Sequence, residues 1–405
     1  MSEYTDYLEW QAETLSPEED GYEEKLLEIA SYFRSFGEAL TAFLVAHGFT
    51  GEVNQPGQKV DFLRRQFRAA GIPAPNRMQG WFRTGKRIQR ETAFQICFAF
   101  GLSVEETNAF FREVCLERSF DCHSIPEAVY YFCIRNGKNY GDAQDILSRM
   151  PEDHKGDLAE GQEILYTGTI VDFIDHARDA EELIGFVKEH LAQFGYNNAT
   201  AVRHIRKRWE EISREDGLAY REGLLRAGTN VSGAERQENY TTVGRTPDST
   251  WRIYAQIMGL DRYQTTQYGR SLKHLLAGND LLPPLAEASF PDRDGIEKIT
   301  GGVHVSHERI RKTLILLEFY AYWAKAVVRA GTILGASSPR EAGRCVAQIN
   351  SYLLDAGYPE LYPGNPYDWI FLWAIQDDRP LDAFRDYMLE LFAYQSEHGE
   401  EGSTT

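Results

Sequence analysis

Basic side chains are concentrated between residues 58 and 90 of this 405-residue chain. The segment holds a single acidic residue, Asp61, so its charge is +8 within a chain of net charge −18, and the other 372 residues carry −26. The basic residues are Lys59, Arg64, Arg65, Arg68, Arg77, Arg83, Lys86, Arg87 and Arg90. A positive patch on a background that repels phosphate is typical of a nucleic-acid contact. The alternative is a solvated basic helix face.

Helices are predicted around these basic residues. Val60 to Ala70 shows helical apolar spacing and is closed by Gly71-Ile72-Pro73. Asn76 can cap a second, short helix that reaches about Thr84, and a third helix runs from Arg90 to a stop at Gly101. Two helices joined by a short turn and followed by further helices have the layout of a helix-turn-helix.

The chain resembles the lambda-repressor/Cro-type helix-turn-helix family in this segment. In that family the second motif helix carries an aromatic residue, then Gly and a basic pair, which this chain matches with Trp81, Gly85, Lys86 and Arg87. The resemblance continues at Leu102-Ser103 and Glu105 to Thr107 and covers roughly residues 58–115, about one seventh of the chain. Pro73 and Pro75 depart from the small polar turn residues of the family, which affects the angle of the second helix. From Cys115 onward the chain is similar to bacterial helical proteins of unknown activity that carry such a motif.

The resemblance implies that the helix from about Asn76 to Thr84 lies in the major groove of double-stranded DNA. Near its N-terminus, base edges would be met by Asn76, Arg77 and Gln79, because Arg and Gln side chains can hydrogen-bond guanine and adenine. Phosphates would be held by Arg83, Lys86 and Arg87, flanked by Arg64, Arg65 and Arg68. Trp81 is expected to pack between helices rather than to contact DNA.

Most periodic stretches of the chain read as helix, and the turn signals of β-hairpins are missing. Four Ser-x-x-Glu signatures predict helix starts, at Ser16, Ser103, Ser124 and Ser338. Ser16 would open a helix whose apolar spacing continues from Leu26 to Leu44. We therefore expect an all-α, multi-helical fold with a helix-turn-helix module and a large helical C-terminal region.

Composition shifts predict four segments along the chain. They are an acidic N-terminal helical segment (1–57), the helix-turn-helix with its following helices (58–150), a middle helical segment with a mobile loop at 228–249 (151–245) and a C-terminal helical domain (246–405). The first 24 residues hold nine acids and neither Lys nor Arg. Such an arm is either a solubilising helical end or a competitor of phosphate for the basic patch.

Several classes of protein are disfavoured by the sequence. It has no apolar run of about 18 residues and no secretory leader, which predicts a cytoplasmic protein. The five cysteines are expected to be reduced, and the spacing of Cys115, Cys122, His123 and Cys133 matches no standard zinc pattern. Phosphate-binding Gly-rich loops, hydrolase elbows and zinc-hydrolase motifs are missing. We expect a non-enzymatic protein without a cofactor.

Together these features predict a sequence-specific DNA-binding protein, a transcriptional regulator whose helical remainder serves sensing or oligomerisation. The alternative is a protein-interaction module, for example one associated with defence or a mobile element, with a vestigial helix-turn-helix. The sequence leaves open a homodimer and a protein partner held by the acidic N-terminus or by the aromatic segment 358–369. The aromatic segment can equally be a structural plug over a helical core. The basic stripe from Arg203 to Arg208 is expected to be a charged helix face, with a second nucleic-acid contact as the alternative.

Overall fold

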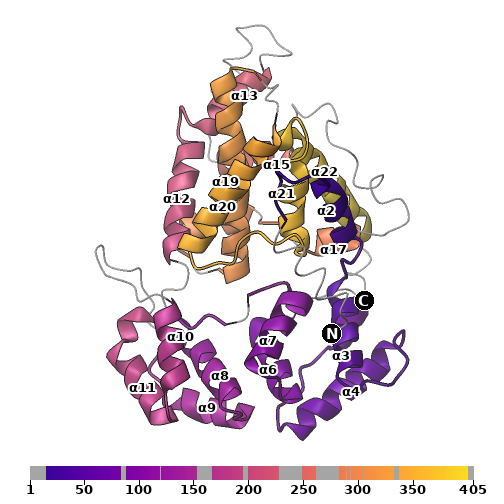
Figure 1. The fold of residues 1–405 in the computed structure, drawn as a ribbon, viewed down its shortest axis with the longest axis vertical. Coiled ribbons are helices and arrows are strands. Elements are labelled where there is room, and N and C mark those ends of the chain that lie inside the picture. The colour runs from indigo at the N-terminus through magenta and orange to yellow at the C-terminus, as the bar shows by residue number, and fades with distance from the viewer. Residues whose placement is uncertain are drawn as a thin grey trace. The chain divides into compact units, whose positions relative to one another are not determined.

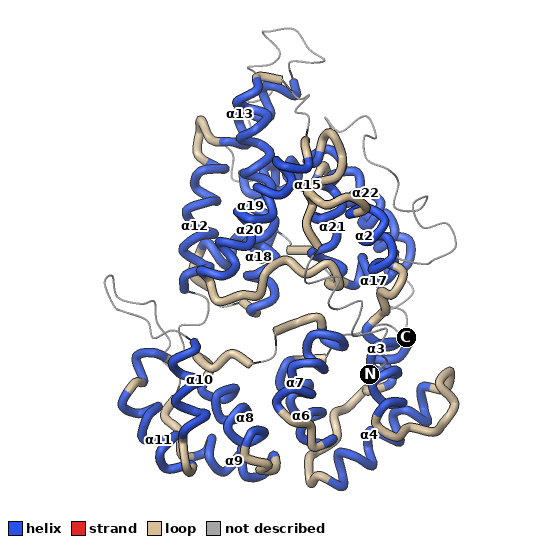
Figure 2. The backbone as a smooth tube through the Cα atoms, in the orientation of Figure 1, coloured by secondary structure: helices blue, strands red, loops and turns tan. Residues whose placement is uncertain are grey.

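A computed structural model describes residues 15–83, 88–118, 120–152, 167–194, 199–227, 249–260, 282–288, 290–291, 293–303, 305–332 and 337–399. Within these ranges the chain forms 19 α-helices, one π-helical turn and one 3-10 turn, and no strand (Figure 2). The predicted all-α class is confirmed. The chain divides into two compact units, each with its own hydrophobic core. Unit 1 comprises Met1–Phe33 and Thr200–Thr405, and unit 2 comprises Arg34–Ala199.

The boundaries of the two units differ from those of the predicted segments. The first helix of the described residues, α2 (Tyr22–Ala30), belongs to unit 1 because it packs against α21 (Pro366–Ala374). The indole Nε1 of Trp369 donates a hydrogen bond to the carbonyl oxygen of Leu26 (2.9 Å), 343 residues away, and the ring of Phe33 meets that of Trp369 edge to face. The predicted border at residue 57 instead falls inside unit 2, within the first turn of α4 (Pro56–Ala69).

Unit 2 carries the basic segment (Figure 1, indigo to magenta). Its helices are α3 (Phe36–Ala46), α4 (Pro56–Ala69), α5 (Gln79–Arg83), α6 (Arg90–Phe100), α7 (Val104–Phe110), α8 (Ile125–Arg135), α9 (Tyr140–Ser148), α10 (Thr167–His176) and α11 (Ala180–Glu189). A π-helical turn (Phe111–Cys115) extends α7, and a 3-10 turn (Leu191–Gln193) follows α11. Helix α5 packs against α3 and α4, and α4 packs against α6. The core is rich in phenylalanine: Phe43 of α3 meets Phe100 of α6 and Phe110 of α7 edge to face, and Phe62 of α4 meets Phe100 in a tilted contact.

Unit 1 is organised around α19 (His307–Ala330), which packs against α13, α18, α20 and α22. Besides α2, α19 and α21, its helices are α12 (Ala199–Ser213), α13 (Leu218–Ala227), α15 (Ser249–Met258), α17 (Leu282–Glu287), α18 (Arg293–Thr300), α20 (Pro339–Asp355) and α22 (Pro380–Gly399). None of the helices in the described ranges combines the length and the apolar character that a bilayer crossing requires.

The predicted helix starts are confirmed at three of four positions. Ser103 forms a complete capping box with Glu106, and the Ser338 hydroxyl accepts a hydrogen bond from the backbone N–H of Glu341. Ser124 is the N-cap residue of α8 (Ile125–Arg135), so this start is also confirmed, but its side chain makes no capping hydrogen bond and the Glu127 carboxylate binds Arg90. The prediction at Ser16 was wrong, since this residue lies in a turn and α2 begins at Tyr22.

The helix expected to continue from Leu26 to Leu44 is broken at residues 31–35. Ser35 caps a new helix there, with a complete capping box to Glu38. Its hydroxyl accepts from the Glu38 backbone N–H, and the Glu38 carboxylate accepts from the Ser35 N–H at 2.9 Å. The break separates α2 of unit 1 from α3 of unit 2.

Candidate nucleic-acid interface

Helix α4 presents three arginines to solvent on one face. Arg64, Arg65 and Arg68 are exposed, whereas Leu63 and Phe67 are buried in the core of unit 2. Spacings of three and four residues place Arg64, Arg65 and Arg68 together with Asp61 on this face. Arg64 Nη1 lies 3.3 Å from the Asp61 carboxylate, an exposed contact that water and salt screen. The face therefore keeps a surplus of positive charge.

The connection after α4 differs from the predicted turn. It spans residues 70–78, nine residues instead of the three or four of a helix-turn-helix. Gly71 ends α4 in the left-handed conformation (φ 71°), and its N–H donates to the Arg68 carbonyl oxygen. Pro73 and Pro75 lie in this connection.

The predicted helix from Asn76 to about Thr84 is corrected to α5, Gln79–Arg83, and Thr84 lies outside the described residues. Arg77 has φ 61°, which no right-handed helix can include, so the helix starts after it and Asn76 cannot be its N-cap. The backbone instead turns through i to i+3 hydrogen bonds, from Gly80 N–H to Arg77 O and from Trp81 N–H to Met78 O, both at 3.1 Å. A left-handed arginine is uncommon, because its Cβ crowds the backbone.

Side chains in the 76–83 segment alternate between the core and solvent. Met78 and Trp81 are buried, which confirms that Trp81 packs between helices. The predicted contact residues of this segment are all exposed: Asn76, Arg77, Gln79 and Arg83. Lys86 and Arg87, with Gly85 of the motif, lie outside the described residues.

Two of the nine basic residues are turned into unit 2. Lys59 is only 6% exposed, and its Nζ donates to Thr41 Oγ1 (2.9 Å) and lies 4.5 Å from the centre of the Phe82 ring. The guanidinium of Arg90 binds both carboxylate oxygens of Glu127 and the carbonyl oxygen of Arg118. Lys59 precedes the buried Leu63 by one helical turn, a spacing that already indicates its inward direction.

The remaining exposed arginines come from two packed elements, α4 and the 76–83 segment. They are Arg64, Arg65, Arg68, Arg77 and Arg83. A guanidinium is permanently charged and offers five N–H donors in a planar fork, which matches phosphate oxygens and the hydrogen-bonding edge of guanine. This surface has the chemistry to bind a polyanion by hydrogen bonding and charge.

The second basic stripe, on α12, is mostly engaged inside unit 1. Arg208 binds the Glu318 carboxylate through Nε (2.8 Å) and Nη2 (2.7 Å), and His204 Nε2 lies 2.6 Å from Asp355 Oδ2. Only Arg203 and Lys207 of this stripe are exposed. These contacts favour the interpretation as a charged helix face.

The cysteines are buried thiols in the described structure. Burial raises the pKa of Cys122 and of Cys133 to about 12 each, so both remain protonated near neutral pH. His123 Nδ1 contacts the carbonyl oxygen of Gln193 at 3.0 Å. Within the ranges that can be described, no three His, Cys, Asp or Glu side chains converge as metal ligands.

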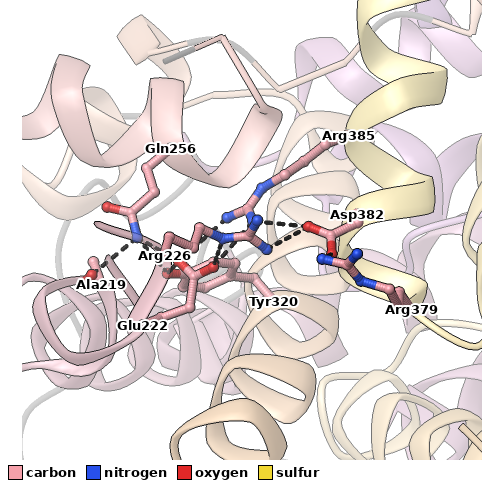
Figure 3. Close-up of polar contacts among 8 residues, drawn as sticks. All are labelled: Ala219, Glu222, Arg226, Gln256, Tyr320, Arg379, Asp382 and Arg385. Carbon is pink, nitrogen blue, oxygen red and sulfur yellow. Dashed lines mark hydrogen bonds and ion pairs between the residues drawn. The ribbon is translucent and has the colours of Figure 1, made fainter. Parts of the chain in front are cut away.

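Unit 1 contains a buried ion network that the sequence did not reveal (Figure 3). Glu222 of α13 is fully buried and pairs with both Arg226 and Arg385. The Nη1 atom of Arg385 lies 3.0 Å from Glu222 Oε1. Asp382 in turn binds Arg226 (2.5 Å) and Arg379 (2.6 Å), and Gln256 donates to the Ala219 carbonyl oxygen. The only sequence signal was the helical spacing of Glu222 with Arg226 and of Arg379, Asp382 and Arg385.

The burial and pairing of this network indicate a structural role. Burial alone would raise the pKa of Glu222, but the charges of Arg226 and Arg385 outweigh it and hold the pKa well below its ordinary value. Glu222 therefore stays ionised inside unit 1. Such a network holds helices together and offers no exposed reacting group.

The aromatic segment 358–369 is also part of the core. Tyr358, Tyr367 and Trp369 are buried, and Asp368 binds Arg311 through two hydrogen bonds of 2.8 and 2.7 Å. These contacts agree with the interpretation of a structural plug.

No protein-family model, no curated protein and no solved structure matches the chain.

Proposed function

We propose that this protein binds double-stranded DNA through the arginine surface of unit 2 and acts as a sequence-specific transcriptional regulator. The observation that carries the proposal is the set of five exposed arginines on α4 and the 76–83 segment, in a chain of net charge −18. A polyanion meets repulsion over most of this protein, so a local positive surface directs where it binds. The other helices would serve sensing or oligomerisation.

Within this surface we assign two roles. Arg64, Arg68 and Arg83 contact phosphates, and the proposal gives the same role to Lys86 and Arg87, which lie outside the described residues. Asn76, Arg77 and Gln79 approach base edges, because the buried Met78 and Trp81 anchor the segment and leave these side chains outward. Phosphate contacts set the strength of binding, and base contacts set its sequence preference.

The test is selection of sheared genomic DNA by the purified full-length protein. Wild type is compared with a double charge reversal on α4, Arg64→Glu with Arg68→Glu. The matched control reverses two exposed basic residues of α12, Arg203→Glu with Lys207→Glu, and changes the net charge by the same amount.

We expect wild type and the α12 control to enrich the same discrete fragments and the α4 variant to enrich none. Affinity should fall with salt at a log–log slope of about −0.9 per phosphate neutralised. Absence of enrichment by wild type at low salt would contradict DNA binding. It would favour the alternative, a protein-interaction module with a vestigial helix-turn-helix.

A further inference from the structure

Lys59 occupies an unusual position for a lysine, because the residue is only 6% exposed and its ammonium contacts side chains of α3 and α5. Lysine is almost never fully buried unless it is paired. Among the residues that the structure describes, Lys59 has no carboxylate within ion-pair distance, and its contacts are a hydroxyl and an aromatic ring. Burial accordingly lowers its pKa. Desolvation of the Lys59 ammonium is unfavourable, so the contacts that the ammonium makes must offset it.

The contacts of Lys59 join three helices. From α4, Nζ donates to Thr41 Oγ1 on α3 and lies 4.5 Å from the centre of the Phe82 ring on α5. The Thr41 hydroxyl donates its own proton to the Gly37 carbonyl oxygen at 2.6 Å, which leaves its lone pairs to accept from Lys59. The Thr41 hydroxyl and the Phe82 ring therefore both hold the ammonium, and neither contact prevents the other.

Helix α5 approaches α3 at the same place. A Cβ atom on Gly37 would lie 2.8 Å from the Trp81 carbonyl oxygen and 3.2 Å from Phe82 Cα. The backbone of α5 thus lies directly on that of α3, one turn of α3 before Thr41. Five residues are too few to hold α5 in place by its own hydrogen bonds, so its position depends on such contacts.

We propose that Lys59 is a positioning residue of the DNA-binding surface, which fixes α5 on α3 through Thr41 and Phe82 and touches no phosphate itself. This inference rests on the proposed function. It removes Lys59 from the set of DNA contacts that charge counting suggests and gives it an indirect role in affinity. The cation–π contact with Phe82 requires the positive charge, so an apolar side chain of similar length cannot replace it.

The test measures binding of a labelled duplex of mixed sequence between about 50 and 200 mM salt. Lys59→Met removes the charge and keeps the length of the side chain, and Arg64→Met does the same at an exposed position of the same helix. We expect Lys59→Met to weaken binding on the order of tenfold at every salt concentration with an unchanged slope. Arg64→Met should reduce the magnitude of the slope by about 0.9, as expected for one lost phosphate contact.

A double-mutant cycle identifies the route of the effect. Phe82→Leu removes the ring face, so Lys59→Met should add little further loss in that background. Thermal unfolding by circular dichroism shows whether each variant is folded at the temperature of the binding experiment. Should Lys59→Met fail to fold, Thr41→Val and Phe82→Leu take its place with the same expected unchanged slope.

The outcomes separate the two proposals. A wild-type protein that does not bind the duplex at low salt overturns the proposed function. If wild type binds and Lys59→Met binds equally well, the positioning role is wrong while DNA binding stands. A smaller slope for Lys59→Met would show that Lys59 contacts phosphate directly, which also overturns the positioning role.

Discussion

Arg90 and Glu127, 37 residues apart, form a two-pronged ion pair that joins the start of α6 to the first turn of α8. Nε and Nη2 of the guanidinium donate to the two carboxylate oxygens at 2.6 and 2.8 Å, and Nη1 donates to the Arg118 carbonyl oxygen. Glu127 also accepts from the Asp121 N–H at 2.7 Å. The pair therefore stabilises the junction between the basic segment and the second half of unit 2.

We expect Glu127→Gln to lower the free energy of unfolding by about 2–3 kcal/mol, because it takes from a partly buried guanidinium its closer and two-pronged charged partner and leaves only the longer contact to Glu117. The control is Glu117→Gln, which removes a longer contact of Arg90 (3.3 Å) at a more exposed carboxylate and should lower it by less than about 1 kcal/mol. Urea unfolding measures both. If both variants lose the same free energy of unfolding, the two-pronged geometry adds no stability beyond that of a single contact.

The left-handed backbone of Arg77 predicts a separation of stability from binding. Both Arg77→Ala and Arg77→Gly remove the guanidinium, but only glycine adopts φ 61° without crowding. We expect the free energy of unfolding of the glycine variant to be about 1 kcal/mol larger than that of the alanine variant. Under the proposed function, both should lose the same affinity for DNA. A difference in binding between them would mean that backbone conformation, and not the side chain, makes the contact.

Gly37 is predicted to be irreplaceable even by alanine. Gly37→Ala places a methyl group against the α5 backbone and should lower the free energy of unfolding by about 1–3 kcal/mol. Gly185→Ala on α11 is the matched control, because a Cβ atom there meets open space and should stabilise by about 0.5–1 kcal/mol. The melting temperature should fall for Gly37→Ala and rise for Gly185→Ala, each relative to wild type. A Gly37→Ala variant as stable as wild type would refute the close approach of α5.

Neutralising Glu222 should destabilise unit 1 strongly. In Glu222→Gln the buried Arg226 and Arg385 lose their shared carboxylate, and we expect a loss of about 3–5 kcal/mol at neutral pH. The folded-state pKa of Glu222 is lowered, so its contribution is present above about pH 4.5 and is lost as the pH falls toward the lower value. The stability gap between wild type and the variant should therefore narrow on acidification below about pH 4.5. A gap that widened there would contradict the assignment of an ionised Glu222.

Sequence reasoning succeeded where the signal was local. The capping box at Ser103 lies within four residues and was predicted, and the same Ser-x-x-Glu signal at Ser35 was available but hidden inside an uninterrupted apolar pattern. At Ser124 the signal predicted the helix start correctly but not the capping contacts, because the Glu127 carboxylate binds a distant arginine. Local patterns show what a side chain is able to bind, and tertiary packing decides which partner it takes.

In the candidate surface, too, the sequence predicted the types of residue but not how packing directs each side chain. Exposure of Arg64, Arg68 and Arg77 agrees with their expected outward direction, but charge counting could not tell them from Lys59. The left-handed Arg77 was also out of reach, since arginine has no sequence preference that marks it.

The contact between Leu26 and Trp369 has a consequence for the order of events during protein synthesis. Helix α2 leaves the ribosome early, yet its partner strip on α21 is translated 343 residues later. At about 5–20 residues per second, the apolar side chains of α2 wait on the order of 20 to 70 s for their native neighbours. All of unit 2 is made within that interval and can complete its own core first. The nascent chain therefore carries the apolar side chains of α2 without their native partner while all of unit 2 is synthesised, and exposed apolar segments of this kind are bound by chaperones.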